Sequence, residues 1–467
     1  MRRVFILSIA ALLAGCVSPP KLGPEPVVRP STQYETARSF QAEAAPWPEA
    51  AWWRAYGDPQ LTLLVEEALA SSPTMAQAAA RLRRAEALVG AAGAATLPSV
   101  SADGSLTVSR PSTEAGVPVL PERQGFHDYG KVGLSFAWEL DFWGKNRASL
   151  AAAKSDAEAA RADAAAARLV ISTSVAATYA DLTRLFADRD VLQETLAVRE
   201  KSLELVTARV AHGFDSEADL AQAQAGPPAA RSELAQADEA IGLTRNRLAS
   251  LLGSGPDRGM SIDRPSAPAL KSFGLPRGLA ADLLGHRPDV VAARWRVEAA
   301  GKRIKVAHAQ FYPNINLLGL LGFEALGVDN LFRGGSDVGA GGPALSLPIF
   351  DGGRRRANYR GARADYDAAV ALYDETVTQA LRDVADVAVS SRQLAREIAG
   401  ADEALHATER AYQLAQLRYS GGAADYQSVL LVEDRLLARR RVAAALRARA
   451  FVLDVSLTRS LGGSVLR

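Results

Sequence analysis

The stretch PIFDGGR at residues 348–354 ends a run of apolar residues and opens a long segment without proline. Only Gly361 and Gly400 interrupt that segment before Arg418, so it predicts one very long helix, about 353–419. At 1.5 Å per residue such a helix reaches about 100 Å, which is about three times the thickness of a bilayer core.

The same order of features occurs once before in the chain. LDFWGK at residues 140–145 closes an earlier strand-like segment, and residues 144–211 then run on without proline or internal glycine. Arg209 lies four residues before Gly213, and the same spacing recurs between Arg418 and Gly422. We therefore expect two internal repeats.

Each repeat is expected to contain a helix, a strand pair, a very long helix and a return helix. The predicted parts are the first repeat 51–252 (strand pair about 97–142, long helix about 144–211), an equatorial linker 253–276, the second repeat 277–461 (strand pair about 312–350, long helix about 353–419) and a C-terminal tail 462–467.

The predicted strands alternate in polarity, as strands with one apolar face do. Val132, Leu134 and Phe136 share one face, and Lys131 and Ser135 share the other. Four strands per chain cannot close a barrel, because about eight strands form the smallest filled one. An open sheet edge cannot face lipid, so several chains must contribute strands to one wall.

The long helices carry apolar stripes with a spacing of three and four residues. One stripe contains Leu192, Leu196, Arg199, Leu203 and Val206, and similar stripes follow in the second long helix and the first return helix. This spacing predicts helices that pack lengthwise as in a coiled coil. An ordinary helical bundle would produce the same stripes, so they do not separate the two arrangements.

The N-terminus predicts an export signal. Arg2 and Arg3 precede an apolar run that is too short to span a bilayer, and the run ends in LAGC at residues 13–16. This ending resembles a bacterial lipobox, which implies cleavage after a signal peptide of residues 1–15, lipidation of Cys16 and anchoring in outer-membrane lipid. Residues 16–50 are rich in proline and are expected to form an extended tether.

Composition argues against several other classes. The formal net charge is +2 and Arg2 and Arg3 account for it, so the mature chain carries no basic excess for binding nucleic acid. Cys16 is the only cysteine, and the five histidines lack metal-ligand spacing. No phosphate loop, nucleophile elbow or acid–base set is present, so we expect no catalytic residues, metal site or cofactor, and no enzyme.

Five motifs in order resemble those of the TolC-like outer-membrane factors, in particular the NodT-type lipoproteins of RND efflux systems. They are WWRAYGDPQL at residues 52–61, GHRPDV at 285–290, FYP at 311–313, PIFDGGR at 348–354, and the pair of Arg418 and Tyr419 before Gly422. The resemblance covers the whole mature chain. It implies a homotrimer with a membrane β-barrel, a long α-helical barrel in the periplasm and an equatorial collar.

The implied function is that of the outer-membrane channel of a tripartite efflux or secretion system. The resemblance implies a periplasmic adaptor and an inner-membrane transporter of RND type as partners. The competing hypothesis is a lipid-anchored periplasmic coiled-coil scaffold or adaptor without a pore. Two matching strand pairs, each followed by a very long helix, favour the channel.

The helices are expected to reverse at Gly213 and Gly422, which would place a periplasmic gate, closed at rest, near these turns. The candidate gate residues are Asp215, Glu217, Asp219, Asp425, Tyr426 and Leu431. Three copies would bring these carboxylates around one opening and attract cations. Acidic residues also favour helix N-termini for local reasons, and that alternative has similar weight.

Two features depart from the family pattern. Leu431 stands where the family often has an aspartate, which predicts an apolar constriction. GPP at residues 226–228 lies inside the first return helix and is expected to interrupt and kink it, because paired prolines remove two helix donors.

Overall fold

The computed structural model describes residues 19–112, 114, 120, 124–266, 270 and 273–463, apart from the side chains of Ala280 and Ala281. The predicted signal peptide 1–15, the lipidation site Cys16 and residues 464–467 of the predicted tail lie outside the described residues.

The chain divides into two compact units, which are described separately. Unit 1 contains the described residues of Met1–Val28, Leu82–Ala159 and Ala293–Tyr373, and unit 2 contains those of Arg29–Arg81, Ala160–Ala292 and Asp374–Arg467. Both units draw segments from both halves of the sequence, so the two repeats fold together.

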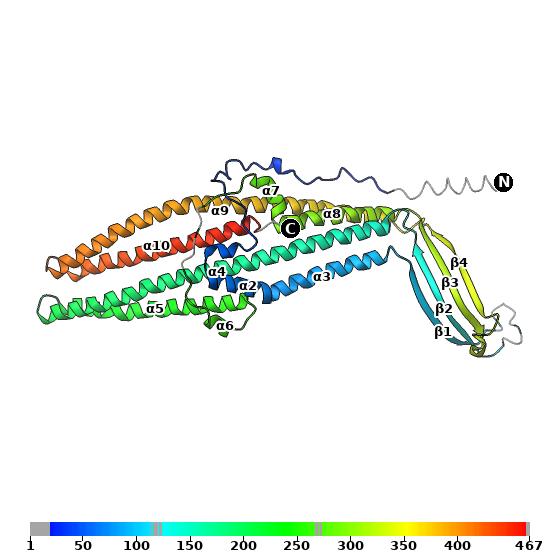
Figure 1. Cartoon of the computed structure of the whole chain (residues 1–467), viewed down its shortest axis with the longest axis horizontal. Helices are drawn as coiled ribbons and strands as arrows, with labels where there is room; N and C mark the ends of the chain where they lie inside the picture. Colours follow the sequence, from blue (N-terminus) through cyan, green and yellow to red (C-terminus); the bar gives the residue numbers. More distant parts are fainter. Residues whose placement is uncertain are drawn as a thin grey trace. The chain divides into compact units, whose positions relative to one another are not determined.

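Helices and strands follow one order in both halves of the chain (Figure 1). In the first half they are α2 Pro59–Ser71, α3 Pro73–Ala94, β1 Ser99–Ser109, β2 His127–Glu139, α4 Lys145–Ala211 and α5 Glu217–Leu251. The second half follows α6 Pro256–Met260 and contains α7 Leu279–His286, α8 Pro288–Ala309, β3 Asn314–Leu326, β4 Asp337–Ser346, α9 Arg354–Ser420 and α10 Tyr426–Ser460.

The two halves match in detail. Helices α4 and α9 each have 67 residues, and α5 and α10 each have 35 residues. This equality confirms the prediction of two internal repeats with one very long helix in each. None of the helices in the described part of the chain is both long enough and apolar enough to cross a membrane.

Unit 1 contains one antiparallel sheet with the strand order β1-β2-β3-β4. Strands β2 and β3 pair across the two repeats, so the predicted strand pairs join into four strands in one sheet. Val132 pairs with Phe323 and Leu134 pairs with Leu321, which places the apolar residues of neighbouring strands on one face. That face is largely open in the single chain, since Leu321 is 69% exposed.

Glycines allow the two repeats to approach closely at the middle of the sheet. A Cβ atom on Gly322 would lie 2.3 Å from the carbonyl oxygen of Val132 and 2.6 Å from the Cα atom of Gly133. No larger residue fits there without moving the backbone. Pro343 pairs with Leu317 within β4, which is an edge strand of the sheet in the single chain, the position where a sheet tolerates proline.

The core of unit 2 forms around the motif at residues 52–61. Gly57 adopts a left-handed conformation with a φ angle of 72°, and Asp58 then accepts hydrogen bonds from the backbone amides of Gln60 and Leu61 at the start of α2. The same carboxylate accepts from the hydroxyls of Tyr179 (2.7 Å) and Ser266 (2.8 Å). Its burial would raise the pKa of Asp58, but these hydrogen bonds lower the pKa below its ordinary value.

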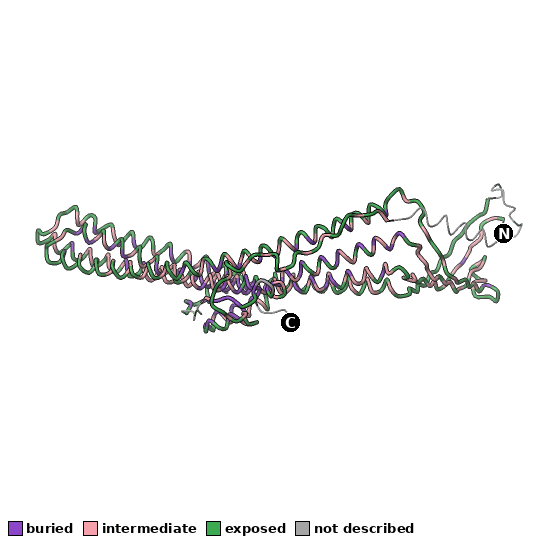
Figure 2. The backbone as a smooth tube through the Cα atoms, turned by 90° about the horizontal axis from the view of Figure 1, so that it is seen from above, coloured by how far each residue is buried: buried purple, intermediate pink, exposed green. Residues whose placement is uncertain are grey.

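An apolar cluster surrounds this capped turn, and buried residues line the facing sides of the helices (Figure 2). Its largest members are Trp52, Trp53, Tyr56, Leu61, Leu64, Tyr179, Leu182, Leu248, Ile262 and Phe451. These residues come from the N-terminal segment, both long hairpins and the linker, so their packing holds these segments of unit 2 against one another.

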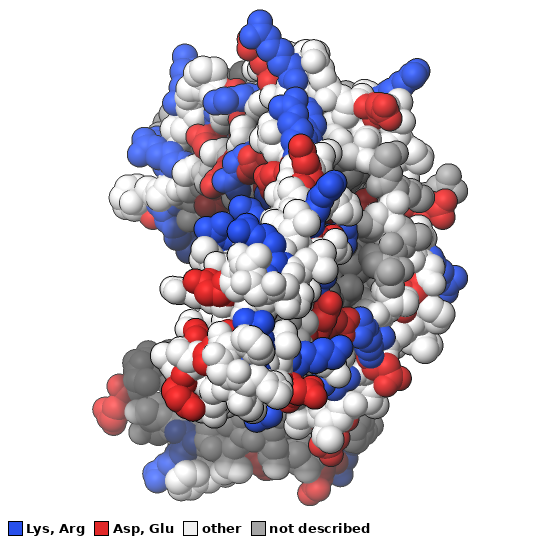
Figure 3. Space-filling model, turned by 90° about the vertical axis from the view of Figure 1, so that its left-hand side faces the viewer, with Lys and Arg blue, Asp and Glu red and all other residues white. Residues whose placement is uncertain are grey.

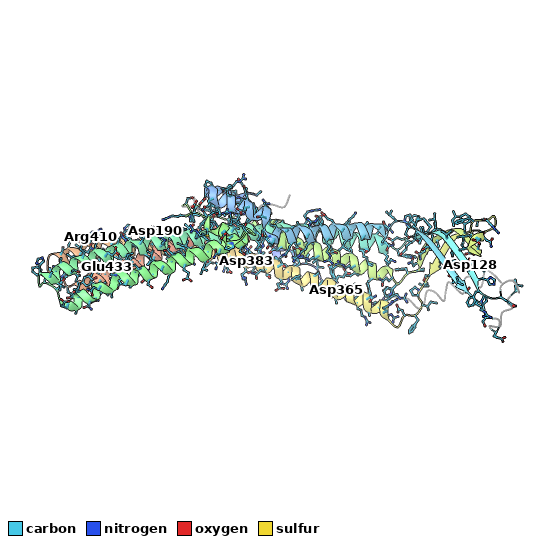
Figure 4. All side chains as sticks on the ribbon, turned by 90° about the horizontal axis from the view of Figure 1, so that it is seen from below. Asp128, Asp190, Asp365, Asp383, Arg410 and Glu433 are labelled. Carbon is cyan, nitrogen blue, oxygen red and sulfur yellow. The ribbon has the colours of Figure 1, made fainter. Side chains whose placement is uncertain are left out.

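Arg287, from the motif at residues 285–290, links three segments of unit 2 through hydrogen bonds. Its guanidinium donates to Asp289 (2.7 Å), to Asp383 on α9 (3.0 Å) and to the carbonyl oxygen of Ser460 at the end of α10 (3.2 Å). Asp383, which is labelled in Figure 4, lies near the middle of α9. The motif is therefore a structural clamp among three helices.

The prediction that residues 226–228 interrupt the return helix is wrong. Helix α5 continues through Pro227 and Pro228. Pro227 is buried, and a Cβ atom on Gly226 would lie 3.1 Å from the Cδ atom of Arg199 on α4. Packing against the neighbouring long helix therefore compensates for the lost backbone donors.

Candidate functional site

Two sharp reversals form the ends of the long hairpins in unit 2. Gly213 ends α4 and Gly422 ends α9, each with a φ angle of 74°. The amide of Phe214 donates to the carbonyl of Arg209, and the amide of Ala423 donates to that of Arg418. These bonds close the helix ends as Schellman motifs, which require the left-handed conformation that glycine adopts without strain.

The helices that leave the two turns begin with the same pair of side chains in exchanged positions. Ser216 caps α5, and its hydroxyl accepts from the backbone amide of Asp219. In return, the backbone amide of Ser216 donates to the carboxylate of Asp219. Asp425 caps α10 and accepts from the amide of Ser428 at 2.9 Å. The acidic residues Asp219 and Asp425 therefore perform local capping in the single chain, as the competing explanation for them predicted.

Asp215 has a different role. Arg209 donates to both of its carboxylate oxygens, at 2.9 Å and 3.1 Å. The hydroxyl of Tyr419 donates to the same carboxylate at 2.5 Å. Asp215 thus connects the first turn to its own long helix and to the end of α9.

The arginine also contacts the tyrosine directly. Its guanidinium lies 4.5 Å from the centroid of the Tyr419 ring and donates to the Tyr419 carbonyl oxygen at 3.3 Å. Arg209, Asp215 and Tyr419 therefore form a closed triangle, which we call the turn lock. The hydrogen bonds from Arg209 lower the pKa of Asp215 below its ordinary range, so the carboxylate is charged at neutral pH.

An apolar cluster lies beside the turn lock. Tyr419 and Tyr426 contact one another with ring centroids 5.9 Å apart, and they pack with Val206, Ala223 and Val429. Tyr426 is buried, so its side chain belongs to the packing between the two hairpins. The cluster contains residues from all four helices of the two hairpins.

A buried ion pair lies further along the same helices. Arg199 on α4 approaches Glu433 on α10 at 2.9 Å, and Glu433 is 1% exposed (Figure 4). Arg199 also bonds Asp434. Burial raises the pKa of Glu433, and the charge of Arg199 opposes that shift. Arg199 therefore occupies the apolar stripe of α4 because a carboxylate faces it from α10.

The other candidate gate residues lie near the turns without entering the turn lock. Glu217 is exposed at the start of α5, and Leu431 is 54% exposed on α10. Figure 3, which faces the end with the two turns, shows acidic and basic side chains interspersed. A ring of carboxylates in an assembly therefore stays a prediction.

The residues that complete the turn lock were not among the candidates chosen from sequence. Arg209 and Tyr419 occur in the repeated motifs, but nothing in their spacing predicts that both contact Asp215. Pairing Asp215 with Tyr419 requires knowledge of how the two hairpins pack.

A family model described as outer membrane efflux protein matches residues 64–254 and 279–463. The fusaric acid resistance protein FusA of Burkholderia cepacia is 36% identical over 369 residues, which cover 77% of this chain and 68% of FusA. The multidrug resistance outer membrane protein MdtP of Shigella flexneri is 30% identical over 466 residues, covering 98% of this chain and 95% of MdtP. The crystal structure of the outer membrane protein VceC from Vibrio cholerae superposes with a TM-score of 0.85 at 43% identity, covering 90% of this chain and 100% of VceC.

Proposed function

Because this chain belongs to the outer membrane efflux protein family, we propose that three copies of it assemble into one exit duct. The chain itself is an outer-membrane efflux channel protein that extends into the periplasm, like its relatives. These relatives favour the channel over the competing hypothesis of a scaffold or adaptor without a pore. We propose no catalytic role.

The sheet supports the trimer. Strands β1 and β4 are the two edges of a four-stranded sheet, and its apolar face is exposed in the single chain. Edges facing lipid would leave backbone donors and acceptors unsatisfied, so neighbouring copies must pair with them. Three copies supply twelve strands, which is enough to enclose a lumen.

The proposed partners are a periplasmic adaptor and an inner-membrane transporter of RND type. FusA is named for resistance to fusaric acid and MdtP for multidrug resistance, which supports small toxic compounds as the exported cargo. The duct is passive in this proposal, since the transporter supplies the energy.

Conductance measurements test the trimeric duct. The protein purified from outer membranes should have the mass of three chains in native mass spectrometry and should form ion-conducting pores in planar bilayers. A monodisperse monomer that needs no detergent would contradict both the trimer and the pore.

We further propose that the two turns form the periplasmic gate and that the turn lock keeps it closed at rest. The lock supports this role because it binds the first turn to α9, so the hairpins cannot separate until its bonds break. In this proposal Leu431 contributes an apolar constriction, and Glu217, Asp219 and Asp425 contribute negative charge near the opening.

The constriction has its own test. Leu431→Glu should raise the resting conductance in planar bilayers, because a charged side chain favours water in an apolar constriction. Leu417→Glu is a matched control on α9, since Leu417 is also exposed near a turn. Equal conductance of the Leu431 variant and the wild type would place the constriction elsewhere.

Cys16 is the proposed lipid attachment site. The mature wild-type chain should begin at Cys16 and carry acyl mass, whereas Cys16→Ser should block lipid attachment and signal-peptide processing. Intact-mass spectrometry checks both, and a wild-type chain without acyl mass would refute the lipid anchor.

A further inference from the structure

A polar hollow lies in unit 1 where the strands meet the long helices. It has a volume of about 470 Å³. Its lining includes the end of β2, the start of β3, the end of β4 and the first residues of α4 and α9. Nothing in the channel function described above uses this hollow.

Basic side chains gather at the two helix starts that line it. Helix α4 begins at Lys145, and α9 begins with Arg354 and Arg355. Neither helix has an acidic residue in its first turn, although the N-terminal end of a helix dipole attracts negative charge. Asp141 and Asp351 already accept from backbone amides at these two helix starts, so any attraction for a further anion comes from the basic side chains.

The carboxylates near the hollow are engaged with other groups. Glu139 pairs with Lys145 at 2.6 Å, and Asp141 accepts from the amide of Arg147 at 2.8 Å. Asp351 accepts from Nε of Arg355 at 2.8 Å. These ion pairs offset the charges of Lys145 and Arg355 as well as those of the acids. Arg354 has no ion pair in the described part of the chain, so it supplies positive charge that remains for an anion.

Arg355 provides the most direct evidence for a missing ligand. Its side chain is 9% exposed, and its second guanidinium nitrogen, Nη1, is buried without a hydrogen-bond partner in the described part of the chain. The Oδ1 atom of Asn314, also in the lining, is likewise buried without a partner among described residues. Buried charged donors are costly unless they are paired, so a group that completes both side chains would be stabilising.

Aromatic side chains surround the same position. Trp143 stacks on Tyr312 with ring centroids 4.6 Å apart, and its indole donates to the carbonyl of Pro313 at 2.8 Å. Phe142 and Phe350 are 64% and 89% exposed. Exposed aromatic residues beside Arg and Lys, at the end of an apolar strand face, are typical of the membrane–water interface.

We propose that this hollow binds the phosphate of a membrane phospholipid from the periplasmic leaflet. The guanidinium groups of Arg354 and Arg355 hold the phosphodiester oxygens, and Oδ1 of Asn314 accepts from a hydroxyl or ammonium group of the headgroup. The acyl chains extend along the exposed apolar face of the sheet. The inference rests on the outer-membrane location of the chain and is independent of the proposed gate.

A binding measurement with three matched arginine variants tests this site. The delipidated full-length channel in detergent is titrated with dihexanoyl-phosphatidylglycerol and followed by native mass spectrometry. Arg355→Ala and Arg354→Ala should each weaken binding about tenfold, as expected for the loss of a charge-assisted bond. Arg356→Ala removes the same charge from the next residue, which is exposed and does not line the hollow, and should bind like the wild type.

Several outcomes would overturn the proposal. If all three variants weaken lipid binding equally, net charge and not this hollow attracts the lipid. If all three bind like the wild type, these arginines do not hold the phosphate. Inorganic phosphate binding as tightly as the lipid would make this a free-anion site. A wild-type channel that binds no lipid would refute lipid binding in this hollow. Arg355 also bonds Asp351, so the Arg355→Ala variant can fail to fold. In that case, the lipid affinities of Arg354→Ala and Arg356→Ala are compared to test the site.

Discussion

The turn between α4 and α5 and the turn between α9 and α10 share one backbone and differ in their side chains. Gly213 and Gly422 have the same φ angle of 74° and close the same kind of helix end. At equivalent positions, however, the first turn has Asp215 where the second has Ala424. The end of α9 has Tyr419 where the end of α4 has Val210.

This difference explains why the turn lock forms only once in each chain. The carboxylate belongs to one repeat and the tyrosine to the other, so neither repeat can make the bond alone. The divergence of a duplicated hairpin has therefore produced two complementary surfaces. The shared backbone sets where the helices reverse, and the differing side chains set how firmly the two reversals are held together.

The substitution Asp215→Ala should have the largest effect on resting conductance, because it gives the first turn the same residue, alanine, that the second turn has at this position. It leaves Arg209 and Tyr419 without their shared acceptor. Hydrogen bonds to charged groups contribute about 1.5–3 kcal/mol each, so the open population should rise about tenfold or more. Resting conductance in planar bilayers measures that rise.

Glu204→Ala is the matched control for this variant, because it removes the same charge from an exposed residue of α4 that belongs neither to the turn lock nor to the proposed opening. It should leave resting conductance unchanged. Similar conductance of Asp215→Ala and Glu204→Ala channels would mean that the turn lock does not control opening.

Tyr419→Phe should have a smaller effect in the same direction. It removes only the hydroxyl bond to Asp215 and retains the ring that contacts Arg209 and Tyr426. Loss of this one bond to a charged acceptor corresponds to about 1.5–3 kcal/mol, less than the loss of all the bonds that Asp215 accepts. Combining it with Asp215→Ala should add little, since both changes break the same contact. A fully additive double variant would contradict direct coupling between the two side chains.

Asp425→Ala tests the second turn. Loss of the helix cap should lower the free energy of unfolding by about 1 kcal/mol in chemical denaturation. It should also weaken cation preference in single-channel recordings if the carboxylates of three copies converge. Asp425→Ser retains a capping side chain without the charge, so it should restore stability but not cation preference. Unchanged selectivity in both variants would confine Asp425 to its capping role.

Acidification should have the smallest effect. The pKa of Asp215 is lowered in the folded chain, so its stabilising contribution is fully present above the ordinary value of about 3.9 and is lost only as the pH falls through the folded value. Resting conductance should therefore stay nearly constant from pH 7 to pH 5 and increase only at more acidic pH. An increase between pH 7 and pH 5 that is absent from Asp215→Ala channels would contradict the low pKa.

The sequence by itself determined the repeated architecture. Two proline-free segments after matching strand ends predicted the two very long helices, and a weak alternation of polarity predicted four strands. Gly213 and Gly422 marked the reversals, because glycine is the residue that adopts a left-handed conformation without strain. These features are local in the chain, so the pattern of residue types is enough to specify them.

Only the tertiary structure decided which side chains meet. Asp215 and Tyr419 are 204 residues apart, and Arg199 and Glu433 lie on α4 and α10, so no local pattern specifies either pair. Packing between the two helices of the first hairpin also overrode a local rule, since Pro227 and Pro228 lie within a continuous helix. The free energy of a long helix comes mainly from its packed faces, so contacts distant in sequence determine what a local breaker can do.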